Sequence, residues 1–222
     1  MIVAAYNQEL TIGSVLDEIP RQHVLQLLVA DSRSTDATAA VAASRGATVV
    51  PVPVPGYGQA WISALEHLRP EVEVVVFLSA DGADKPGELA CLLVPIRLDR
   101  ADLVIGSRLM GKREPGSLPA REILGSWLAA FLIRLLYGVE VTDLGPFRAI
   151  RRSVLEDLAL EPAAIAWTAE MIVKAARLGY RITEVPAGTR RLVRRTRPSK
   201  SSWKVLRAVL RTIFRYARGP VR

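Results

Sequence analysis

The chain has 222 residues, 50% of them apolar and 23% charged, so it can bury one sizeable core and need not divide into independent domains. Its single cysteine excludes an intramolecular disulfide framework and a cysteine-rich zinc site. The net charge of +8 is concentrated at one end, because residues 189–222 hold twelve of the 30 basic residues and none of the 22 acidic ones.

Five short apolar segments in the first half of the chain predict β-strands. They cover residues 2–6, 24–31, 47–52, 72–81 and 101–107, and the apolar spacing between the first four is helical. Strands that alternate with helices form a parallel sheet that is covered on both faces. The sequence therefore predicts an α/β fold with a Rossmann-like, mostly parallel sheet and helices on both faces. Cys91, in an apolar setting after the fourth segment, is expected to be a buried structural thiol.

Polar residues follow four of these strands. Tyr6 and Asn7 end the first strand, Asp31 the second, Ser79-Ala80-Asp81 the fourth and Ser107-Arg108 the fifth. In such sheets ligands bind outside the carboxyl ends of the strands. These groups, distant in the sequence, are therefore expected to converge on one edge of the sheet.

The stretch "FLSADGADKP" places two carboxylates, Asp81 and Asp84, directly after a buried strand. The diphosphate of a nucleotide sugar must leave with its charge neutralised, and a divalent cation held by carboxylates can do this. An Asp-Gly pair after a strand is also a common turn, so the stretch alone leaves a purely structural interpretation open.

Two long helical patterns follow in the second half of the chain. Residues 119–138 predict an apolar helix, but its uninterrupted apolar run of 123–133 is too short to span a membrane. Residues 202–217 place apolar side chains at helical spacing with basic residues elsewhere, which is typical of an amphipathic helix in a lipid headgroup layer. A helix that packs on its own domain with a solvated basic face is the alternative. No secretory signal precedes the first strand, so we expect a cytoplasmic protein, peripheral on the cytoplasmic face of the membrane.

Several ordered motifs resemble glycosyltransferase family 2, whose members have the GT-A fold. They are "VAAYNQELTIGSVL", "ADSRSTDAT", "GYGQAW", "FLSADGADKP", "VIGSR" and "VTDLGPFRAIRR", followed by "WTAEMIVKAARLGYRITEVP" and "RRTRPSKSSW". The likeness covers nearly the whole chain and is greatest to the polyprenyl-phosphate sugar transferases, such as dolichol-phosphate mannose synthase. It implies a GT-A domain over 1–188, with a nucleotide-binding half (1–110) and an acceptor half (111–188). The basic loop and amphipathic helix of 189–222 are expected to belong to the same unit.

The resemblance implies a binding site for a UDP- or GDP-linked sugar together with Mg²⁺ or Mn²⁺. Its nucleotide-sugar-binding residues are Ala4, Tyr6, Asn7, Asp31, Gly58, Ser79, Ala80 and Asp81, and the candidate metal ligands are Asp81 and Asp84. Ser79 stands where the Asp-X-Asp motif of the family has its first acid. Serine contributes no negative charge, so the metal affinity is expected to be lower or to depend more on the phosphates of the donor. A degenerate, non-catalytic relative that still binds a sugar nucleotide is the alternative.

The resemblance also implies an acceptor side. Its phosphate-binding residues are Arg108, Arg148, Arg194, Arg195 and Lys200, and its catalytic residues are Arg108, Asp143 and Glu170. A polyprenyl phosphate is already anionic and needs no general base, whereas a hydroxyl acceptor would require Asp143 or Glu170 as the base. The basic tail and the apolar helix favour the lipid acceptor.

The predicted function is a metal-assisted hexosyl transfer from a nucleoside diphosphate sugar to an acceptor, with a polyprenyl phosphate at an anionic membrane surface favoured. A soluble hydroxyl acceptor is the alternative, and the pairing of two copies in a homodimer is left open. Nucleic acid is not an expected partner, because the aromatic residues are few and no nucleic-acid motif is present. A nucleotidyltransferase is disfavoured, since "AAYNQELT" lacks the Gly-rich loop with Arg and Lys that usually follows the first strand of such enzymes.

Overall fold

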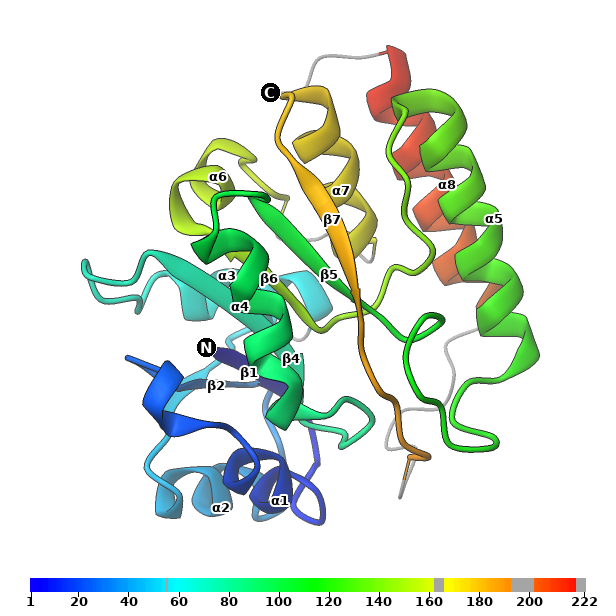
Figure 1. Cartoon of the computed structure of the whole chain (residues 1–222). Coiled ribbons are helices and arrows are strands. Elements are labelled where there is room, and N and C mark those ends of the chain that lie inside the picture. Colours follow the sequence, from blue (N-terminus) through cyan, green and yellow to red (C-terminus); the bar gives the residue numbers. More distant parts are fainter. Residues whose placement is uncertain (55, 162–165, 193–201, 219–222) are drawn as a thin grey trace.

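A computed structural model describes residues 1–54, 56–161, 166–192 and 202–218 of the chain. The strands in these residues form one seven-stranded sheet in the order β3-β2-β1-β4-β6-β5-β7 (Figure 1). Their bounds are β1 (Ile2–Ala5), β2 (Leu28–Asp31), β3 (Thr48–Pro51), β4 (Val74–Ser79), β5 (Leu103–Ser107), β6 (Arg148–Arg151) and β7 (Ile182–Pro186). All pairings are parallel except those of β6, which runs antiparallel to both of its neighbours.

Helices cover both faces of this sheet. They are α1 (Ile12–Asp17), α2 (Thr38–Ser44), α3 (Tyr57–Leu65), α4 (Leu89–Arg97), α5 (Ala120–Tyr137), α6 (Arg152–Asp157), α7 (Trp167–Arg177) and α8 (Ser202–Arg218), with short 3₁₀ turns at Arg21–His23 and Pro86–Glu88. The apolar side chains of α1, α2 and α4 pack on one face, and those of α3 and α5 to α8 pack on the other. Neighbouring strand residues divide between the two cores, as Phe77 and Leu78 do, because successive side chains of a strand point to opposite faces. The mostly parallel α/β architecture predicted from the sequence is therefore present.

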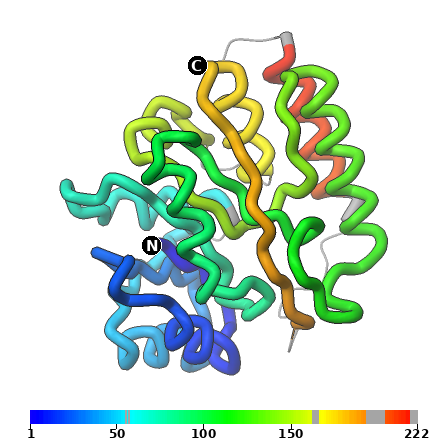
Figure 2. Tube along the Cα trace, viewed as in Figure 1, coloured from blue at the N-terminus to red at the C-terminus, as the bar shows by residue number. Residues whose placement is uncertain are grey.

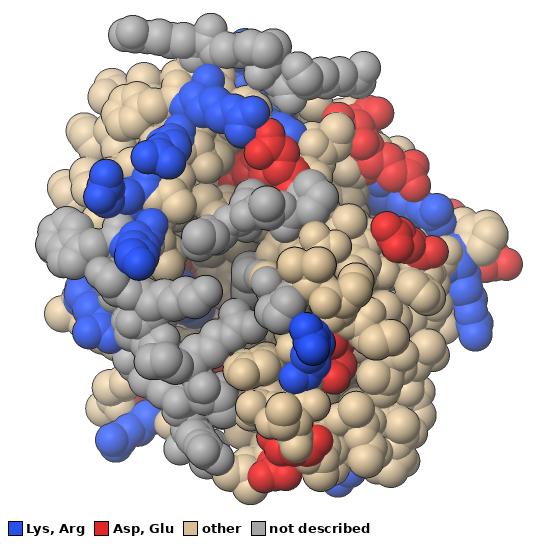
Figure 3. Space-filling model, turned by 180° about the vertical axis from the view of Figure 1, so that it is seen from behind, with Lys and Arg blue, Asp and Glu red and all other residues tan. Residues whose placement is uncertain are grey.

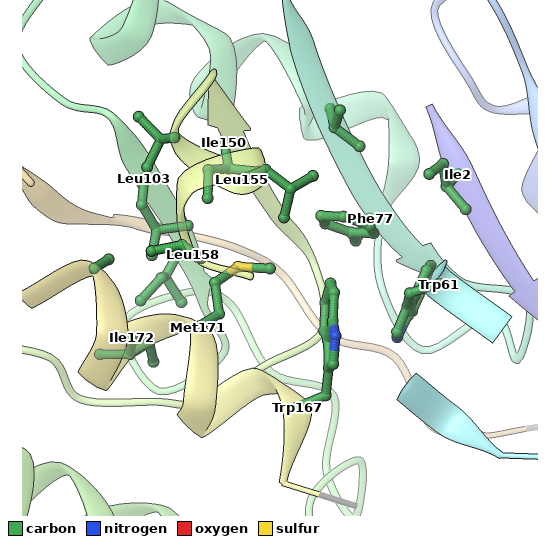
Figure 4. Close-up of a cluster of buried hydrophobic side chains, with 14 of the residues drawn as sticks. Ile2, Trp61, Phe77, Leu103, Ile150, Leu155, Leu158, Trp167, Met171 and Ile172 are labelled. Atoms are coloured by element: carbon green, nitrogen blue, oxygen red, sulfur yellow. The ribbon is translucent and has the colours of Figure 1, made fainter. Parts of the chain in front are cut away.

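An aromatic cluster lies in the core beneath the centre of the sheet (Figure 4). Trp61 of α3 stacks on Trp167 of α7 with 5.9 Å between ring centroids, and Phe77 of β4 meets both rings edge-on. Aromatic pairs in these geometries add to the free energy gained from burial. The cluster ties α3, β4 and α7 together, so strand β4 has a rigid support on this side.

Helices α5 and α8 lie side by side at one end of the molecule, as the chain trace in Figure 2 and the ribbon in Figure 1 both show. The hydroxyl of Tyr137 donates a hydrogen bond to the carbonyl of Ile213, and a guanidinium nitrogen of Arg177 on α7 donates to the carbonyl of Tyr216 at 2.6 Å. Within the described residues, no helix combines the length and the apolar character needed to cross a bilayer.

Two expectations from the sequence need correction. Cys91 is exposed rather than buried, because α4 turns Leu89, Leu92, Leu93 and Ile96 inward and leaves position 91 on its outer face. Strands β6 and β7 were not expected from the sequence. The residues of β6 read Arg-Ala-Ile-Arg, which hides the apolar pattern of a strand that is buried at its first three positions.

Candidate active site

The loops after β1 and β2 form one hydrogen-bonded unit at the carboxyl edge of the sheet. The backbone nitrogen of Asn7 donates to the hydroxyl of Ser34 at 2.9 Å, and the side-chain oxygen of Asn7 accepts from the backbone nitrogen of Thr35 at 2.8 Å. The Ser34 hydroxyl in turn donates to the carboxylate of Asp31. Asn7 has a φ of 51°, a left-handed conformation that asparagine tolerates better than most residues. These contacts bring Asn7 and Asp31, two predicted nucleotide-binding residues, to the same place.

The turn after β4 lies next to this unit. The backbone nitrogen of Ala80 donates to the carbonyl of Ala4 at 2.9 Å, so two more predicted donor-binding positions are adjacent. Asp81 begins a tight turn in which its Oδ1 accepts from the backbone nitrogen of Ala83 at 3.0 Å. Gly82 follows with a φ of +79°, a conformation that glycine adopts without strain. The turn leaves the Asp81 side chain partly exposed at the edge of the sheet.

Asp84, by contrast, is almost completely buried, with 2% of its surface exposed. Neither of its carboxylate oxygens has a hydrogen-bond partner in the described part of the chain. Burial raises the pKa of Asp84 to about 7, and the negative charge of Asp81 adds to this rise, while the positive charge of Arg108 opposes it. An unpartnered buried carboxylate is costly unless a cation or a proton neutralises it.

The oxygen atoms of Asp81 and Asp84 fit a hard divalent cation such as Mg²⁺ or Mn²⁺. Their charges interact, and the oxygens of Asp84 are free to act as ligands in the described structure. No group of three or more Asp, Glu, His or Cys side chains that could hold a metal is found within the described residues. Two carboxylates alone would leave several coordination positions for other oxygen atoms.

Arg108, at the end of β5, forms a bidentate ion pair with Asp143. Its Nε lies 2.7 Å from Oδ2 of Asp143, and its Nη2 lies 2.9 Å from Oδ1. The buried carboxylate also accepts from the backbone nitrogens of Arg108 and Leu144, at 3.1 and 2.8 Å, and from the hydroxyl of Ser126 on α5 at 3.1 Å. Burial alone would raise the pKa of Asp143, but the hydrogen bonds and charge of Arg108 outweigh it and hold the pKa below its usual value. Asp143 therefore stays ionised and holds the guanidinium in one orientation.

Glu184 on β7 holds the backbone of the loop that carries Asp143. Its two carboxylate oxygens accept from the backbone nitrogens of Asp143 and Thr142, at 3.0 and 2.8 Å. Glu184 and Ser126 were not among the residues predicted from the sequence. An acid within the short apolar stretch "ITEVP" was the available signal for Glu184, whereas nothing in the sequence marked Ser126.

Thr189, just beyond β7, joins three segments of the site. It forms isolated β-bridges with Asp84 and with Arg113. Its backbone nitrogen donates to the carbonyl of Lys112, and its carbonyl accepts from the nitrogen of Glu114, both at 3.0 Å. Thr189 is fully buried, yet its hydroxyl has no hydrogen-bond partner among the described residues. The sequence prediction did not include it.

The same connection places Arg191 at the wall of a pocket. Arg191 lines a pocket of about 270 Å³ together with Gly116, Ser117 and Leu192. Ser117 is buried and its hydroxyl has no partner within the described ranges. Arg194, Arg195 and Lys200, predicted to bind phosphate, lie outside the described residues.

Arg148, predicted to bind phosphate, lies in the protein interior. The guanidinium of Arg148 is fully buried and donates to the carbonyls of Gly145 and Thr168, the latter at 2.9 Å. This placement favours a structural role, in which Arg148 ties the loop of Asp143 to α7, over direct phosphate binding.

Glu170 is buried beneath α8. Its Oε1 lies 2.9 Å from Nζ of Lys174, and it also accepts from the hydroxyl of Tyr216 at 3.3 Å. These contacts favour a role in holding α8 over a role as catalytic base. Of the other predicted donor-binding residues, Gly58 is buried in the first turn of α3, whereas Tyr6, just after β1, and Ser79, at the end of β4, are partly buried.

The chain matches a family model and several named proteins. The family model described as glycosyl transferase family 2 matches residues 1–159. An undecaprenyl-phosphate mannosyltransferase of Micrococcus luteus is 33% identical, over 83% of this chain and 80% of its own length. A polyprenol monophosphomannose synthase of Mycolicibacterium smegmatis is 30% identical, over 84% of this chain and 75% of its own length.

Among solved structures, the similarity extends over the whole fold. Glucosyl-3-phosphoglycerate synthase from Mycobacterium tuberculosis, in complex with Mn²⁺, UDP-glucose and phosphoglyceric acid, superposes with a TM-score of 0.78 at 28% identity. The match covers 99% of this chain and 79% of that one. The same enzyme in complex with Mn²⁺, UDP and phosphoglyceric acid superposes with a TM-score of 0.76.

Proposed function

This chain belongs to glycosyl transferase family 2, and from that premise we propose that it moves a hexosyl group from a nucleoside diphosphate sugar to a polyprenyl phosphate. The observation that carries the proposal is the state of Asp143, which accepts hydrogen bonds from Arg108, Ser126 and Leu144 and has a lowered pKa. A carboxylate so engaged is a poor general base. An acceptor that is already anionic needs none, and a phosphate oxygen meets this condition.

The donor would lie across the loops after β1, β2 and β4. Asn7, Asp31 and Ala80 meet there, and Asp81 with Asp84 would hold Mg²⁺ or Mn²⁺. When bound, the cation would neutralise charge on the diphosphate leaving group. The Mn²⁺ and UDP of the structural neighbour support this arrangement.

Arg108 would bind and orient the acceptor phosphate. Its bidentate pairing with Asp143 fixes the plane of the guanidinium before any substrate arrives, and its side chain remains partly accessible. In the reaction, an oxygen of the acceptor phosphate forms a bond to the anomeric carbon while the bond from that carbon to the diphosphate breaks. The nucleoside diphosphate leaves, and positioning together with charge stabilisation accounts for most of the catalysis.

An exposed apolar stripe on α5 supports a lipid acceptor. Leu124, Trp127, Phe131 and Leu135 repeat at helical spacing, and each side chain is at least half exposed, from 50% for Phe131 to 67% for Leu135. Trp127 and Phe131 stack with their centroids 5.9 Å apart. Aromatic and aliphatic side chains on one helix face are suited to the headgroup and acyl boundary of a bilayer.

Helix α8, which packs against α5, carries exposed basic side chains. The exposed cations of α8 are Lys204, Arg207, Arg211 and Arg215. The view from behind in Figure 3 shows Lys and Arg side chains along the side of the molecule where α8 lies. Cations beside an apolar stripe suit an anionic membrane surface, so we propose peripheral attachment to the cytoplasmic face of a membrane.

A small phosphorylated acceptor is the second candidate. The structural neighbour carries phosphoglyceric acid, and the pocket beside Ser117 and Arg191 is large enough for a compact phosphate group. Such an acceptor would be glycosylated on a hydroxyl and would need a base. Asp143 is poorly suited to that role, which places this candidate second.

Transfer can be measured with purified full-length protein and the four pairs formed by UDP-glucose or GDP-mannose with undecaprenyl phosphate vesicles or phosphoglyceric acid. Mass spectrometry of the products with Mn²⁺ present should show a glycosylated lipid phosphate. Arg108→Lys, which keeps the charge but loses the paired donors, should lower the rate, and Arg152→Lys on α6, at a partly exposed ion pair with Glu156, is the matched control. Product only with phosphoglyceric acid would support the second candidate. Nucleotide binding without any product from these pairs would contradict the proposed transfer and favour a non-catalytic relative.

A further inference from the structure

Position 79, at the end of β4, holds a serine and therefore brings no carboxylate to the metal site on which the proposed function rests. Ser79 ends β4 in register with Ala4 of β1 and can offer a cation only a neutral hydroxyl. A site that binds a diphosphate through a divalent cation needs carboxylate charge near that cation. We propose that Asp84, together with the hydroxyl of Thr189, supplies the oxygen ligands that position 79 does not.

Among the described residues, the surroundings of Asp84 offer no free partner for its charge. Both of its oxygens are unpartnered within the described chain, and its carboxylate interacts through space with the charges of Asp81, Arg108 and Asp143. The guanidinium of Arg108, the cation among these groups, already forms a bidentate pair with Asp143. Glu88, another carboxylate close enough to interact, accepts a hydrogen bond from the nitrogen of Gly188 at 2.6 Å. Asp84 therefore faces acids and an engaged arginine.

The β-bridge with Thr189 adds a third unpartnered oxygen. Residues directly opposite in an antiparallel bridge have Cβ atoms about 5 Å apart and side chains on the same face. The backbone nitrogen and carbonyl of Thr189 pair with Lys112 and Glu114, whereas its hydroxyl has no partner in the part of the chain that the structure describes. Two carboxylate oxygens and one hydroxyl thus form a buried set of acceptor oxygens, and a cation satisfies such a set where an anion would not.

The backbone around this set is closely packed. A Cβ at Gly111 would lie 1.9 Å from the carbonyl oxygen of Ala187, and a Cβ at Gly188 would lie 2.8 Å from the Lys85 side chain. The nitrogen of Arg190 also donates to the carbonyl of Ala83 at 2.8 Å. Glycines at both positions allow the segment after β7 to lie against the loops of Asp84 and Lys112. The ligand set is therefore held in place by the fold before any cation binds.

The test is Mn²⁺ affinity, measured by the loss of the free Mn²⁺ signal in electron paramagnetic resonance, with and without UDP or GDP. We expect Asp84→Asn to weaken Mn²⁺ binding at least about tenfold and Thr189→Val to weaken it about threefold, since a carboxylate binds a hard cation more strongly than a hydroxyl does. Asp17→Asn, which removes an exposed carboxylate, and Thr183→Val on β7 are the matched controls and should bind Mn²⁺ as the parent does. Adding Ser79→Asp to Asp84→Asn should restore much of the lost affinity.

The outcomes separate this inference from the proposed function. Wild-type Mn²⁺ affinity in folded Asp84→Asn, together with loss of affinity in Asp81→Ala, would overturn the inference and leave the glycosyl transfer standing. A parent protein that binds neither nucleotide nor Mn²⁺ would overturn both. Circular dichroism and thermal unfolding of each variant establish that it is folded.

Discussion

Replacing Asp84 by asparagine should stabilise the metal-free protein. The substitution removes a buried carboxylate that has no hydrogen-bond partner in the described structure and keeps the shape of the side chain. The pKa of Asp84 is raised from 3.8 to about 7, so the folded state holds a proton that the unfolded state has already released between these values. The free energy of unfolding therefore falls as the pH rises from about 4 to about 7, and it changes little from this group above pH 7.

The size of the effect follows from that difference in pKa. Each pKa unit corresponds to about 1.4 kcal/mol, so a shift of about three units gives an upper limit of about 4 kcal/mol at pH 8. The amide of asparagine must also be desolvated, which reduces the expected gain to about 1 to 3 kcal/mol. At pH 4 the gain should nearly vanish, because Asp84 is then neutral in the folded state.

Urea unfolding of parent and Asp84→Asn at pH 4 and pH 8, in EDTA, measures this difference. The exposed Asp17→Asn variant is the control, for which we expect no comparable gain at either pH. Mn²⁺ should stabilise the parent more than Asp84→Asn, because a ligand that binds only the folded state raises the free energy of unfolding. A variant less stable than the parent at pH 8, or a gain of equal size at both pH values, would refute the reasoning about the buried charge.

Three further changes test other parts of the molecule. Asp143→Asn should lower the free energy of unfolding at pH 7 by about 3 kcal/mol, since it leaves Arg108 without its ionic partner. Because the pKa of Asp143 is lowered in the folded state, this difference between parent and variant should begin to shrink as the pH falls below about 4 and should be lost as the pH falls through the lower pKa of the folded state, as urea unfolding would show. Arg108→Lys should lower kcat/KM for sugar transfer about 100-fold with little change in the dissociation constant for UDP, and a parallel loss of UDP binding would contradict its acceptor role. Trp127→Glu should weaken binding to anionic vesicles about tenfold in a flotation assay without lowering the melting temperature, and unchanged flotation would count against the α5 stripe as the membrane contact.

Local sequence patterns predict some strands of the sheet and miss others. Strands β1 to β5 could be predicted because each is a short apolar run bounded by polar or turn residues. Strand β6 could not be predicted, because arginines such as Arg148 and Arg151 usually lie at the surface. In the folded protein, Arg148 donates to the carbonyls of Gly145 and Thr168, and Arg151 donates to the carboxylate of Asp102. Those partners lie up to 49 positions away in the sequence.

The site residues divide in the same way. The sequence by itself determined the family and the α/β order, and it placed Asn7, Asp31, Asp81 and Arg108 at one edge, because parallel strands end at the same side of a sheet. Only the tertiary structure decided that Arg148 and Glu170 are buried against other partners, and that Asp84 and Thr189 face each other across a bridge. The physical reason is that burial and hydrogen-bond satisfaction depend on contacts between distant segments. The sequence does not distinguish an aspartate that pairs with an arginine in the folded protein, as Asp143 does, from one that is left unpartnered among the described residues, as Asp84 is.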